Sequence, residues 1–257
     1  MFESLTTRER ELLDFIMDMP NASVAEMAEH CGVSEVTIRA MLREFEKNGL
    51  YIRSHGGGMP SFHPLMLKRI EAHHGIKLKL AKAAAALIED GDDLMLVGGT
   101  TTSFIPRYLY GRRNVKIITN STLLMPYART NEGVEYIFTG GEFRPDQESL
   151  VGAITLRQLR QFHVKTVYTG MDGFMPGEGY TADSVEIAEI VRTMCDQADR
   201  TVIVTDSDKF ARPGFATMLS LRDVDLIVTD DGISEDKHKA LAKAGVELRI
   251  VDCKEGK

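Results

Sequence analysis

Three basic residues recur at helical spacing in the N-terminal part of this chain. Arg39, Arg43 and Lys47 follow one another at i, i+4 positions, so on a helix their side chains share one stripe. The apolar residues of the same segment recur on the opposite stripe and are Ile38, Leu42 and Phe45. A cationic stripe of this kind can contact phosphates or base edges in the major groove of DNA. A solvated charged surface is the simpler interpretation for an isolated helix.

A second group of polar residues follows the predicted strand at residues 94–97. Gly98, Gly99, Thr100, Thr101 and Thr102 form a loop that leads into a predicted helix. Consecutive backbone amides, hydroxyls and a helix N-terminus can together bind an anion, for which phosphate is the natural candidate. An ordinary turn with an N-cap explains this loop equally well when it is considered alone.

Four further predicted strands of the same region also end in polar residues. These ends are Asn120-Ser121, Gly140-Gly141, residues 170–173 and residues 206–209. Lys209 could supply the cation for a phosphate, and Asn120 and Asp172 could exchange hydrogen bonds with sugar hydroxyls. For Asp206 and Asp208, turn or cap chemistry is the simpler role. We therefore expect an effector site that contains Gly99, Thr100, Thr101, Thr102, Asn120, Asp172 and Lys209.

The basic stripe is preceded by two predicted helices. Thr6-x-x-Glu9 and Ser23-x-x-Glu26 are capping-box patterns, Gly32 makes a turn, and Ser34 can cap the third helix, for which Gly49 offers a stop. A short strand at 50–52 and the glycines at 56–58 then predict a hairpin. The order indicates a winged helix-turn-helix, whose expected DNA contacts are Ser34, Thr37, Arg39, Arg43, Lys47, Arg53 and His55.

From about residue 77 the chain alternates between predicted helices and strands. The expected strands are 94–97, 115–119, 134–139, 164–169, 201–205, 226–229 and 246–251, and the expected helices are 78–90, 102–110, 122–130, 152–161, 184–197 and 235–244. Continuous β-branched runs mark strands that are covered on both faces. The pattern predicts an open, mainly parallel α/β sheet that binds ligands at the carboxyl ends of its strands.

The predicted organisation is two domains with a connecting segment. We place a DNA-binding domain at residues 1–58 and an effector-binding domain at residues 76–257. Pro60 and Pro64 punctuate the segment between them, so residues 59–75 are expected to be a linker in which a helix begins around Leu65.

Composition excludes several classes of protein. The chain has 257 residues, of which 43% are hydrophobic and 27% charged, as in ordinary soluble domains. It holds no apolar run of about 18 residues and no secretory signal, so we expect a cytoplasmic protein with no membrane partner. Its three cysteines show no C-x-x-C spacing, and we expect neither a disulfide framework, a metal nor another cofactor.

The charge of the first domain is acidic. Residues 1–58 contain 6 Lys and Arg against 10 Asp and Glu, a net charge of −4 out of −7 for the whole chain. A non-specific DNA binder would be basic, because phosphate neutralisation supplies most of its affinity. Binding must therefore use a local basic face and the avidity of two or more linked domains.

Taken together, the chain resembles a DeoR-type transcriptional regulator, a bacterial family of sugar-phosphate-responsive repressors. The segments that carry the resemblance are VSEVTIR (33–39), GLYIRSHGGG (49–58), GGTTTS (98–103), TNS (119–121), GG (140–141), SLVG (149–152), DG (172–173), GYT (179–181) and DSDKF (206–210). The resemblance implies a winged helix-turn-helix followed by a ribose-5-phosphate-isomerase-like α/β sensor domain. It also implies double-stranded operator DNA, a phosphorylated sugar effector and a homo-oligomer.

The chain departs from the family pattern at two places. Arg39-Ala40-Met41-Leu42 stands where the family usually has Arg-Arg-Asp-Leu, so one cation and one carboxylate of the third helix are replaced. Val97 and Gly98 stand where an Asp is common before the Gly-Thr-Thr loop, which removes an expected hydroxyl contact.

An enzyme of the sugar-phosphate isomerase class is the main alternative. Such an enzyme needs a carboxylate base. In the related isomerases, the Asp-Gly pair that resembles Asp172-Gly173 is followed by further acidic residues. Here Phe174 and Met175 follow instead, and the remaining candidates are Glu178, Asp183 and Glu186. These three are more simply a turn residue, a helix N-cap and an exposed carboxylate, so binding without turnover is favoured. His73-His74 lacks the ligand spacing of a metal site.

Overall fold

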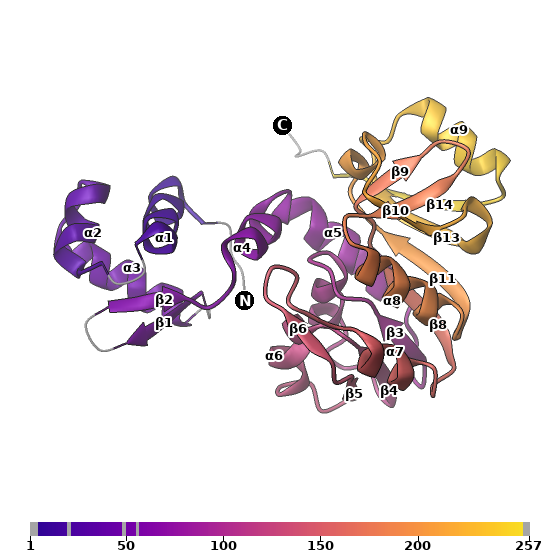
Figure 1. Cartoon of the computed structure of the whole chain (residues 1–257), viewed down its shortest axis with the longest axis horizontal. Helices are drawn as coiled ribbons and strands as arrows, with labels where there is room; N and C mark the ends of the chain where they lie inside the picture. Colours follow the sequence, from indigo (N-terminus) through magenta and orange to yellow (C-terminus); the bar gives the residue numbers. More distant parts are fainter. Residues whose placement is uncertain (1–4, 20–21, 48–49, 55–56, 254–257) are drawn as a thin grey trace. The chain divides into compact units, whose positions relative to one another are not determined.

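The computed structural model describes residues 5–19, 22–47, 50–54 and 57–253. It divides the chain into two compact units, Met1–His74 and Gly75–Lys257, each of which is considered by itself (Figure 1). None of the described helices is both long enough and apolar enough to cross a membrane.

Both predicted capping boxes begin helices of the first unit. Helix α1 (Thr7–Asp18) starts after Thr6, whose hydroxyl accepts the backbone N–H of Glu9 at 3.3 Å. Helix α2 (Val24–Cys31) starts after Ser23 in the same way, and Gly32 ends it in the left-handed conformation with φ 61°. Each cap satisfies orphan backbone donors of the first turn, which is why these helices begin where the sequence predicts.

The rest of the first unit is the third helix, a hairpin and a fourth helix. Helix α3 (Glu35–Lys47) packs on α2, and strands β1 (Tyr51–Ser54) and β2 (Gly57–Pro60) pair antiparallel. The segment 59–75, predicted as a linker with a helix near Leu65, holds the end of β2, helix α4 (Pro64–Glu71) and the start of α5 (His74–Ala85). Helix α2 packs against both α1 and α3, and apolar side chains of all three helices are buried.

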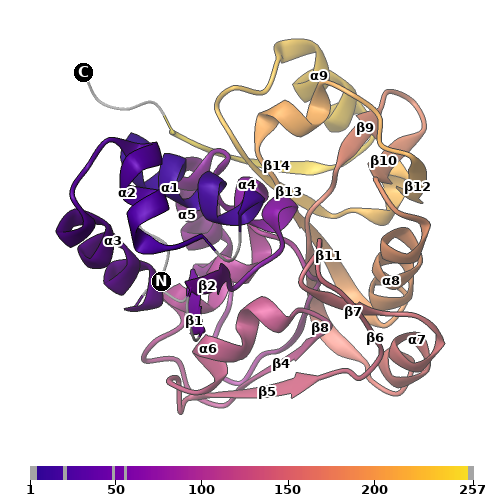
Figure 2. The same ribbon diagram turned by 60° about the vertical axis from the view of Figure 1, so that its left-hand side comes forward.

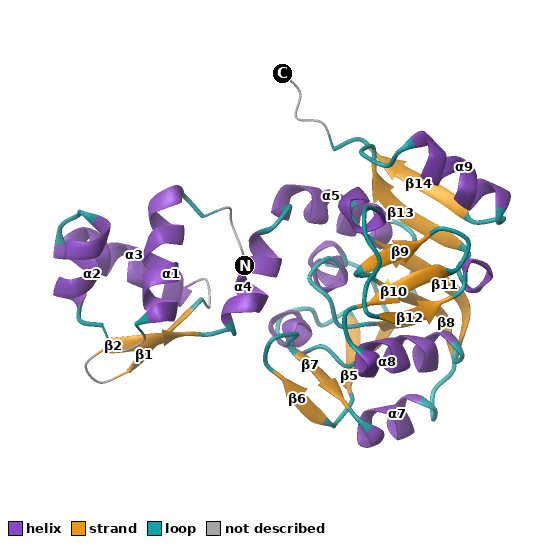
Figure 3. Cartoon of the chain, turned by 45° about the horizontal axis from the view of Figure 1, so that its top comes forward, coloured by secondary structure: helices purple, strands orange, loops and turns teal. Residues whose placement is uncertain are grey.

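A seven-stranded sheet forms the centre of the second unit, and every neighbouring pair in it is parallel. Its order is β14-β13-β11-β8-β3-β4-β5; these strands are labelled in Figure 1, and Figure 3 draws all strands in orange. The strands are β3 (Asp93–Leu96), β4 (Val115–Thr119), β5 (Val134–Phe138), β8 (Val164–Thr169), β11 (Ala198–Val204), β13 (Leu226–Asp230) and β14 (Glu247–Val251). The prediction of seven strands in a mainly parallel sheet is thereby confirmed.

Helices cover this sheet, and Figure 2 shows α5 and α8 (Val185–Cys195) on opposite sides of it. Val167, Ile203 and Ile227 of the central strands are fully buried beside apolar residues of α8. Two more helices lie within segments predicted as helical, namely α7 (Ala153–Leu159) and α9 (Glu235–Lys243). Burial on both faces accounts for the continuous apolar runs of the strands.

Two predicted helices have a different form. Residues 102–110 were expected as an α-helix but hold the 3₁₀ helix η1 (Thr102–Tyr108), and residues 122–130 hold the short pieces η2 (Thr122–Leu124) and α6 (Met125–Ala128). Pro106 lies inside η1 and Pro126 lies at the start of α6. Because proline lacks a backbone N–H and clashes with the preceding turn, neither segment continues as a long α-helix.

Five short strands that the structure describes in the second unit lie outside the main sheet. One antiparallel sheet has the order β12-β10-β9, and a second consists of β6 and β7. Their bounds are β6 (Glu142–Arg144), β7 (Ser149–Val151), β9 (Gly173–Met175), β10 (Gly179–Ala182) and β12 (Ala216–Leu219). Two 3₁₀ turns, η3 (Ser207–Phe210) and η4 (Leu221–Asp223), complete the described elements.

Candidate functional site

The exposed face of α3 lies opposite its buried stripe. Ile38, Leu42 and Phe45 are at most 3% exposed and hold the helix against the first unit's core. The predicted basic stripe is on the other side, with exposed side chains at Arg39, Arg43 and Lys47. The amphipathic pattern read from the sequence therefore places all three cations where a ligand could reach them.

The first turn of α3 is capped by its own hydroxyls. Ser34 Oγ accepts the backbone N–H of Thr37 at 3.2 Å and lies 2.9 Å from Thr37 Oγ1. Both residues are exposed. Their hydroxyls thus stand at the beginning of the helix, where a DNA backbone or base edge could take over part of the hydrogen bonding.

Two of the three cations already have carboxylate partners on the same helix. Arg39 Nη2 lies 3.1 Å from Glu35 Oε2, and Lys47 Nζ lies 3.4 Å from Glu44 Oε1. Arg43 makes no ion pair with any residue that the structure describes. Exposed pairs of this type are weak, so they can break when DNA binds. Arg43 can contact DNA without first breaking such a pair.

The expected wing contacts are less fully described. Arg53 lies on β1, where its backbone pairs with Gly58 of β2. His55, and the predicted helix stop at Gly49, lie outside the described residues. Their expected roles stay predictions.

The second candidate site lies at the point where the order of the main sheet reverses. Strand β3 has β4 on one side and β8 on the other, and the chain moves outward from β3 first through β4 and later through β8. In open α/β sheets, ligands bind outside the carboxyl ends of the strands at such a switch point. The loops after β3, β4 and β8 therefore meet at the favoured place for a ligand.

The loop after β3 offers unpaired backbone donors. Within the described part of the chain, the N–H groups of Gly99, Thr100 and Thr101 have no acceptor. Thr102 Oγ1 donates to the carbonyl of Val97 at 2.7 Å and lies 3.1 Å from that of Gly99, so its hydroxyl proton is used inside the loop. Thr102 thus braces the loop, while three consecutive amides stay available for an anion.

Asn120 joins this loop to a neighbouring segment. Its Oδ1 accepts the Gly98 N–H at 2.9 Å, and its Nδ2 donates to the Leu150 carbonyl at 3.1 Å. The side chain is 0% exposed. It was predicted to read a sugar, whereas its observed contacts hold the loop in place, and sequence alone cannot reveal which backbone groups a buried amide will meet.

Ser149 is a residue of this site that the sequence interpretation did not single out. It is 0% exposed, and its Oγ has no hydrogen-bond partner. A Cβ built on Gly98 would lie 3.1 Å from Ser149 Cβ and 3.4 Å from Asn120 Oδ1, so only glycine fits there without displacing a neighbour. The motif SLVG (149–152) was the available signal, and the unsatisfied hydroxyl gives it a physical meaning.

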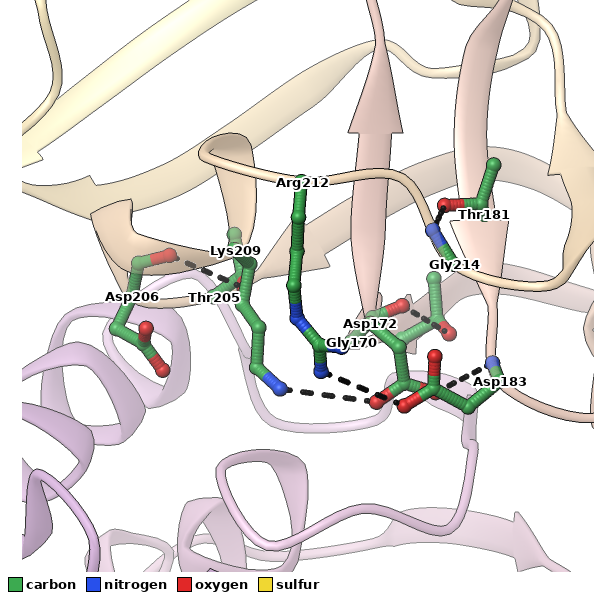
Figure 4. A network of polar contacts seen from close by, with 10 residues as sticks. Gly170, Asp172, Thr181, Asp183, Thr205, Asp206, Lys209, Arg212 and Gly214 are labelled. Atoms are coloured by element: carbon green, nitrogen blue, oxygen red, sulfur yellow. Dashed lines mark hydrogen bonds and ion pairs between the residues drawn. The ribbon is translucent and has the colours of Figure 1, made fainter.

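Lys209 and Asp172 lie together on the other side of the switch point. Lys209 Nζ is 3.7 Å from Asp172 Oδ1, with 29% and 17% of the two side chains exposed (Figure 4). Asp172 Oδ2 also accepts the backbone N–H of Asp183 at 3.0 Å. The two predicted site residues are therefore brought together, and the carboxylate orients the lysine.

Asp206 differs from its expected turn or cap role. It stands at the N-cap position of η3, but its side chain makes no capping hydrogen bond and is buried at the end of β11. The neighbouring turn is held by Asp230, whose carboxylate accepts the Ser207 N–H and hydroxyl, both at 2.7 Å. Asp206 is thus a buried carboxylate close in sequence to Lys209.

The carboxylates considered for isomerase chemistry are poorly placed to act as a base. Asp183 lies 3.6 Å from Arg212, and Glu178 is exposed on a turn. Glu186 accepts from Ser184 Oγ at 2.8 Å and from Arg144 at 2.6 Å, and these bonds, that of Ser184 first, lower its pKa. A base needs the opposite shift. The described residues also contain no cluster of three or more metal-ligating side chains.

Two family models match this chain. Residues 8–59 match the DeoR-like helix-turn-helix domain, and residues 72–231 match the DeoR C terminal sensor domain. A protein of Escherichia coli O157:H7, assigned as an aga operon transcriptional repressor, is 31% identical over 95% of this chain and 93% of its own. The HTH-type transcriptional regulator GlpR of Haloferax volcanii is 28% identical over 94% and 96%.

Among solved structures, ribose 5-phosphate isomerase A from Methanocaldococcus jannaschii aligns with 54% of this chain and 55% of its own, at 19% identity and a TM-score of 0.40. The two family matches together span both units of the chain, in the order predicted from the sequence. The chain therefore belongs to the DeoR family of DNA-binding transcriptional regulators, not to the isomerases that were the alternative.

Proposed function

We propose that the chain represses a carbohydrate-utilisation operon and that a phosphorylated sugar or sugar derivative changes its affinity for operator DNA. The effector would bind at the carboxyl ends of β3, β4, β8 and β11. Relatives assigned as repressors, and the match to a sensor domain, support the regulatory part of this proposal.

The unpaired amides of Gly99, Thr100 and Thr101 are the observation that carries the effector class. They are consecutive, Thr102 and Asn120 hold their loop from either side, and they lie at the switch point of the sheet. Three fixed donors bind a phosphate well but provide no full charge. A dianionic phosphate therefore also requires a cation, and Lys209 is our candidate.

The Lys209 ammonium group would interact with both the Asp172 carboxylate and the phosphate. At 3.7 Å its pair with Asp172 is loose, and both side chains are partly exposed, so an incoming phosphate can draw the ammonium towards itself. Asp172 would then accept a hydrogen bond from a sugar hydroxyl through Oδ1, the carboxylate oxygen that faces Lys209. Ser149 contributes a hydroxyl with no partner of its own.

On the DNA side, we propose that α3 enters the major groove and that Arg53 and His55 lie nearer the backbone. A homo-oligomer would present paired reading helices to two half-sites, and this avidity offsets the acidic charge of the first domain. The protein would act in the cytoplasm with the chromosome. Binding of the effector would then change the affinity for DNA, and binding of DNA would change the affinity for the effector by the same coupling free energy.

A ligand screen tests the effector class. Full-length protein is melted with a panel of sugar phosphates, with the matching unphosphorylated sugars and with inorganic phosphate. A ligand of the native state raises the melting temperature by mass action. We expect at least one sugar phosphate to do so where its free sugar does not, and a panel in which only unphosphorylated sugars act would contradict the proposal.

The variant Lys209→Ala tests the site, with Lys116→Ala as its matched control. Both lysines have an aspartate neighbour, Lys116 at 3.8 Å from Asp93, but Lys116 lies near the amino end of β4 and so at the opposite edge of the sheet. We expect Lys209→Ala to keep DNA binding and lose the response to the sugar phosphate in an operator-release assay, while Lys116→Ala responds normally. Equal effector sensitivity of the two variants would remove Lys209 from the site.

A further inference from the structure

The exposed face of α3 is not basic along its whole length. Val36 is 74% exposed, and Ala40, one helical turn further on, is exposed as well. Arg43 and Lys47 follow on the same face at i+7 and i+11 from Val36. The face thus has an apolar half towards the amino end and a cationic half towards the carboxyl end.

Packing within the first unit does not explain Val36. The buried stripe of the helix is on the other side, at Ile38, Leu42 and Phe45. A single exposed apolar residue on an ordinary surface requires no explanation. Val36, however, lies in the first turn of α3, for which the proposed function above gives the role of reading helix, and the amino-terminal residues of reading helices contact base edges.

Ala40 extends this apolar surface at a position where the family usually has a cation. The replacement of that arginine leaves no charged side chain next to Val36 in the i+4 direction. An arginine there would favour a guanine, whose O6 and N7 accept a bidentate contact. Alanine removes that preference and leaves room for an apolar group of the DNA to approach.

We propose that Val36, with Ala40 beside it, contacts the 5-methyl group of thymine in each operator half-site. That methyl is the one apolar group that the bases present in the major groove, and contact with small apolar side chains is how proteins recognise it. Arg43 and Lys47 then contact phosphates or an adjacent base. Val36 is thus a specificity-determining residue, and it selects thymine over cytosine at its position.

Uracil in place of thymine isolates this contact, because it removes only the methyl group. Preferred sites are first selected from a random DNA pool with the full-length protein. Each thymine of the selected site is then replaced in turn by deoxyuridine. Burial of one methyl is worth about 0.8 kcal/mol, so we expect about fourfold weaker binding at one thymine of each half-site.

Variants then assign the penalty to its residue. In Val36→Ala, the uracil penalty at that position should fall clearly below that of the wild type, because most of the apolar surface that contacts the methyl is removed. Arg43→Ala is the matched control on the same face: its overall affinity should fall while the uracil penalty stays. Since Val36 is largely exposed, its replacement leaves the core untouched, and unchanged melting confirms that the variant is folded.

Three results would overturn the inference. A selected site that tolerates uracil at every thymine shows that no methyl contact exists. A uracil penalty that persists in Val36→Ala assigns the contact to another residue. A selection that enriches no sequence removes the reading role of α3 itself, which is a different failure from the first two.

Discussion

The proposed reading helix, α3, and the proposed effector site are built in opposite ways. The functional side chains of α3 are exposed, and they all come from one regular helix. At the carboxyl ends of the sheet strands, the groups proposed to bind the effector come from loops after four different strands. Several of the polar residues there, including Asn120, Thr102 and Ser149, are buried. One site presents side chains, whereas the other presents backbone amides that buried side chains hold.

This difference determines how far function can be separated from stability. Removing an exposed side chain of α3 leaves the apolar core of the first unit intact, so its effect should fall on DNA binding alone. Removing a buried brace of the effector site leaves backbone groups unsatisfied and destabilises the domain as well. Substitutions in and beside the two sites test the contrast.

The largest effect is expected for Asn120→Ala. The Gly98 N–H and the Leu150 carbonyl would both lose their partner, and each unsatisfied group costs about 1–3 kcal/mol. We expect the free energy of unfolding to fall by about 2–6 kcal/mol, the sum of the two penalties. The chain contains no tryptophan, so urea denaturation is followed by circular dichroism.

Arg160→Ala is the control for this variant, because Arg160 is exposed and has no side-chain partner among the described residues. Its unfolding should match the wild type within about 0.5 kcal/mol. If Asn120→Ala were as stable as this control, the buried amide would not be bracing the loop, and the contrast between the two sites would fail.

Arg43→Ala should weaken operator binding without changing stability. A lost base contact is worth about 1–3 kcal/mol, which corresponds to roughly 5- to 150-fold in affinity. Arg39→Ala should lower the affinity for the operator less, because Arg39 already forms an ion pair with Glu35. Both are measured by titrating the promoter region at several salt concentrations; a larger loss for Arg39→Ala would make the paired arginine the main reader.

Local patterns were sufficient to predict much of this structure. The capping boxes at Thr6 and Ser23 depend on residues three positions apart, and both are formed. The seven strands of the main sheet were visible because burial on both faces requires continuous apolar runs. The stripe of Arg39, Arg43 and Lys47 followed from the helical period alone.

Features that depend on distant partners could not be predicted. The short strands β6, β7, β9, β10 and β12 have three or four residues each, too few for a periodic signal. Lys209 and Asp172 are 37 positions apart in the sequence, and nothing local to either indicates their pairing. Asn120 and Ser149 belong to the proposed effector site only because the segment after β4 meets β7 beside Gly98.

The smallest effect is expected at Glu148, next to Ser149, and it depends on pH. Thr122 Oγ1 donates to the Glu148 carbonyl at 3.0 Å and also contacts its carboxylate, which is buried. Burial raises the pKa of Glu148, and the Thr122 bond opposes this only in part. With a folded-state pKa above the unfolded one, stability from this group is fully present below about pH 4.5 and is lost as pH rises through the folded value.

Glutamine keeps the acceptor and removes the charge, so Glu148→Gln should melt above the wild type at pH 7.5, with a difference that shrinks towards pH 5. Glu178→Gln, at an exposed carboxylate, should show no such trend. A difference for Glu148→Gln that stays constant with pH would mean that its carboxylate is not desolvated, and that the segment next to Ser149 is as open to water as the face of α3.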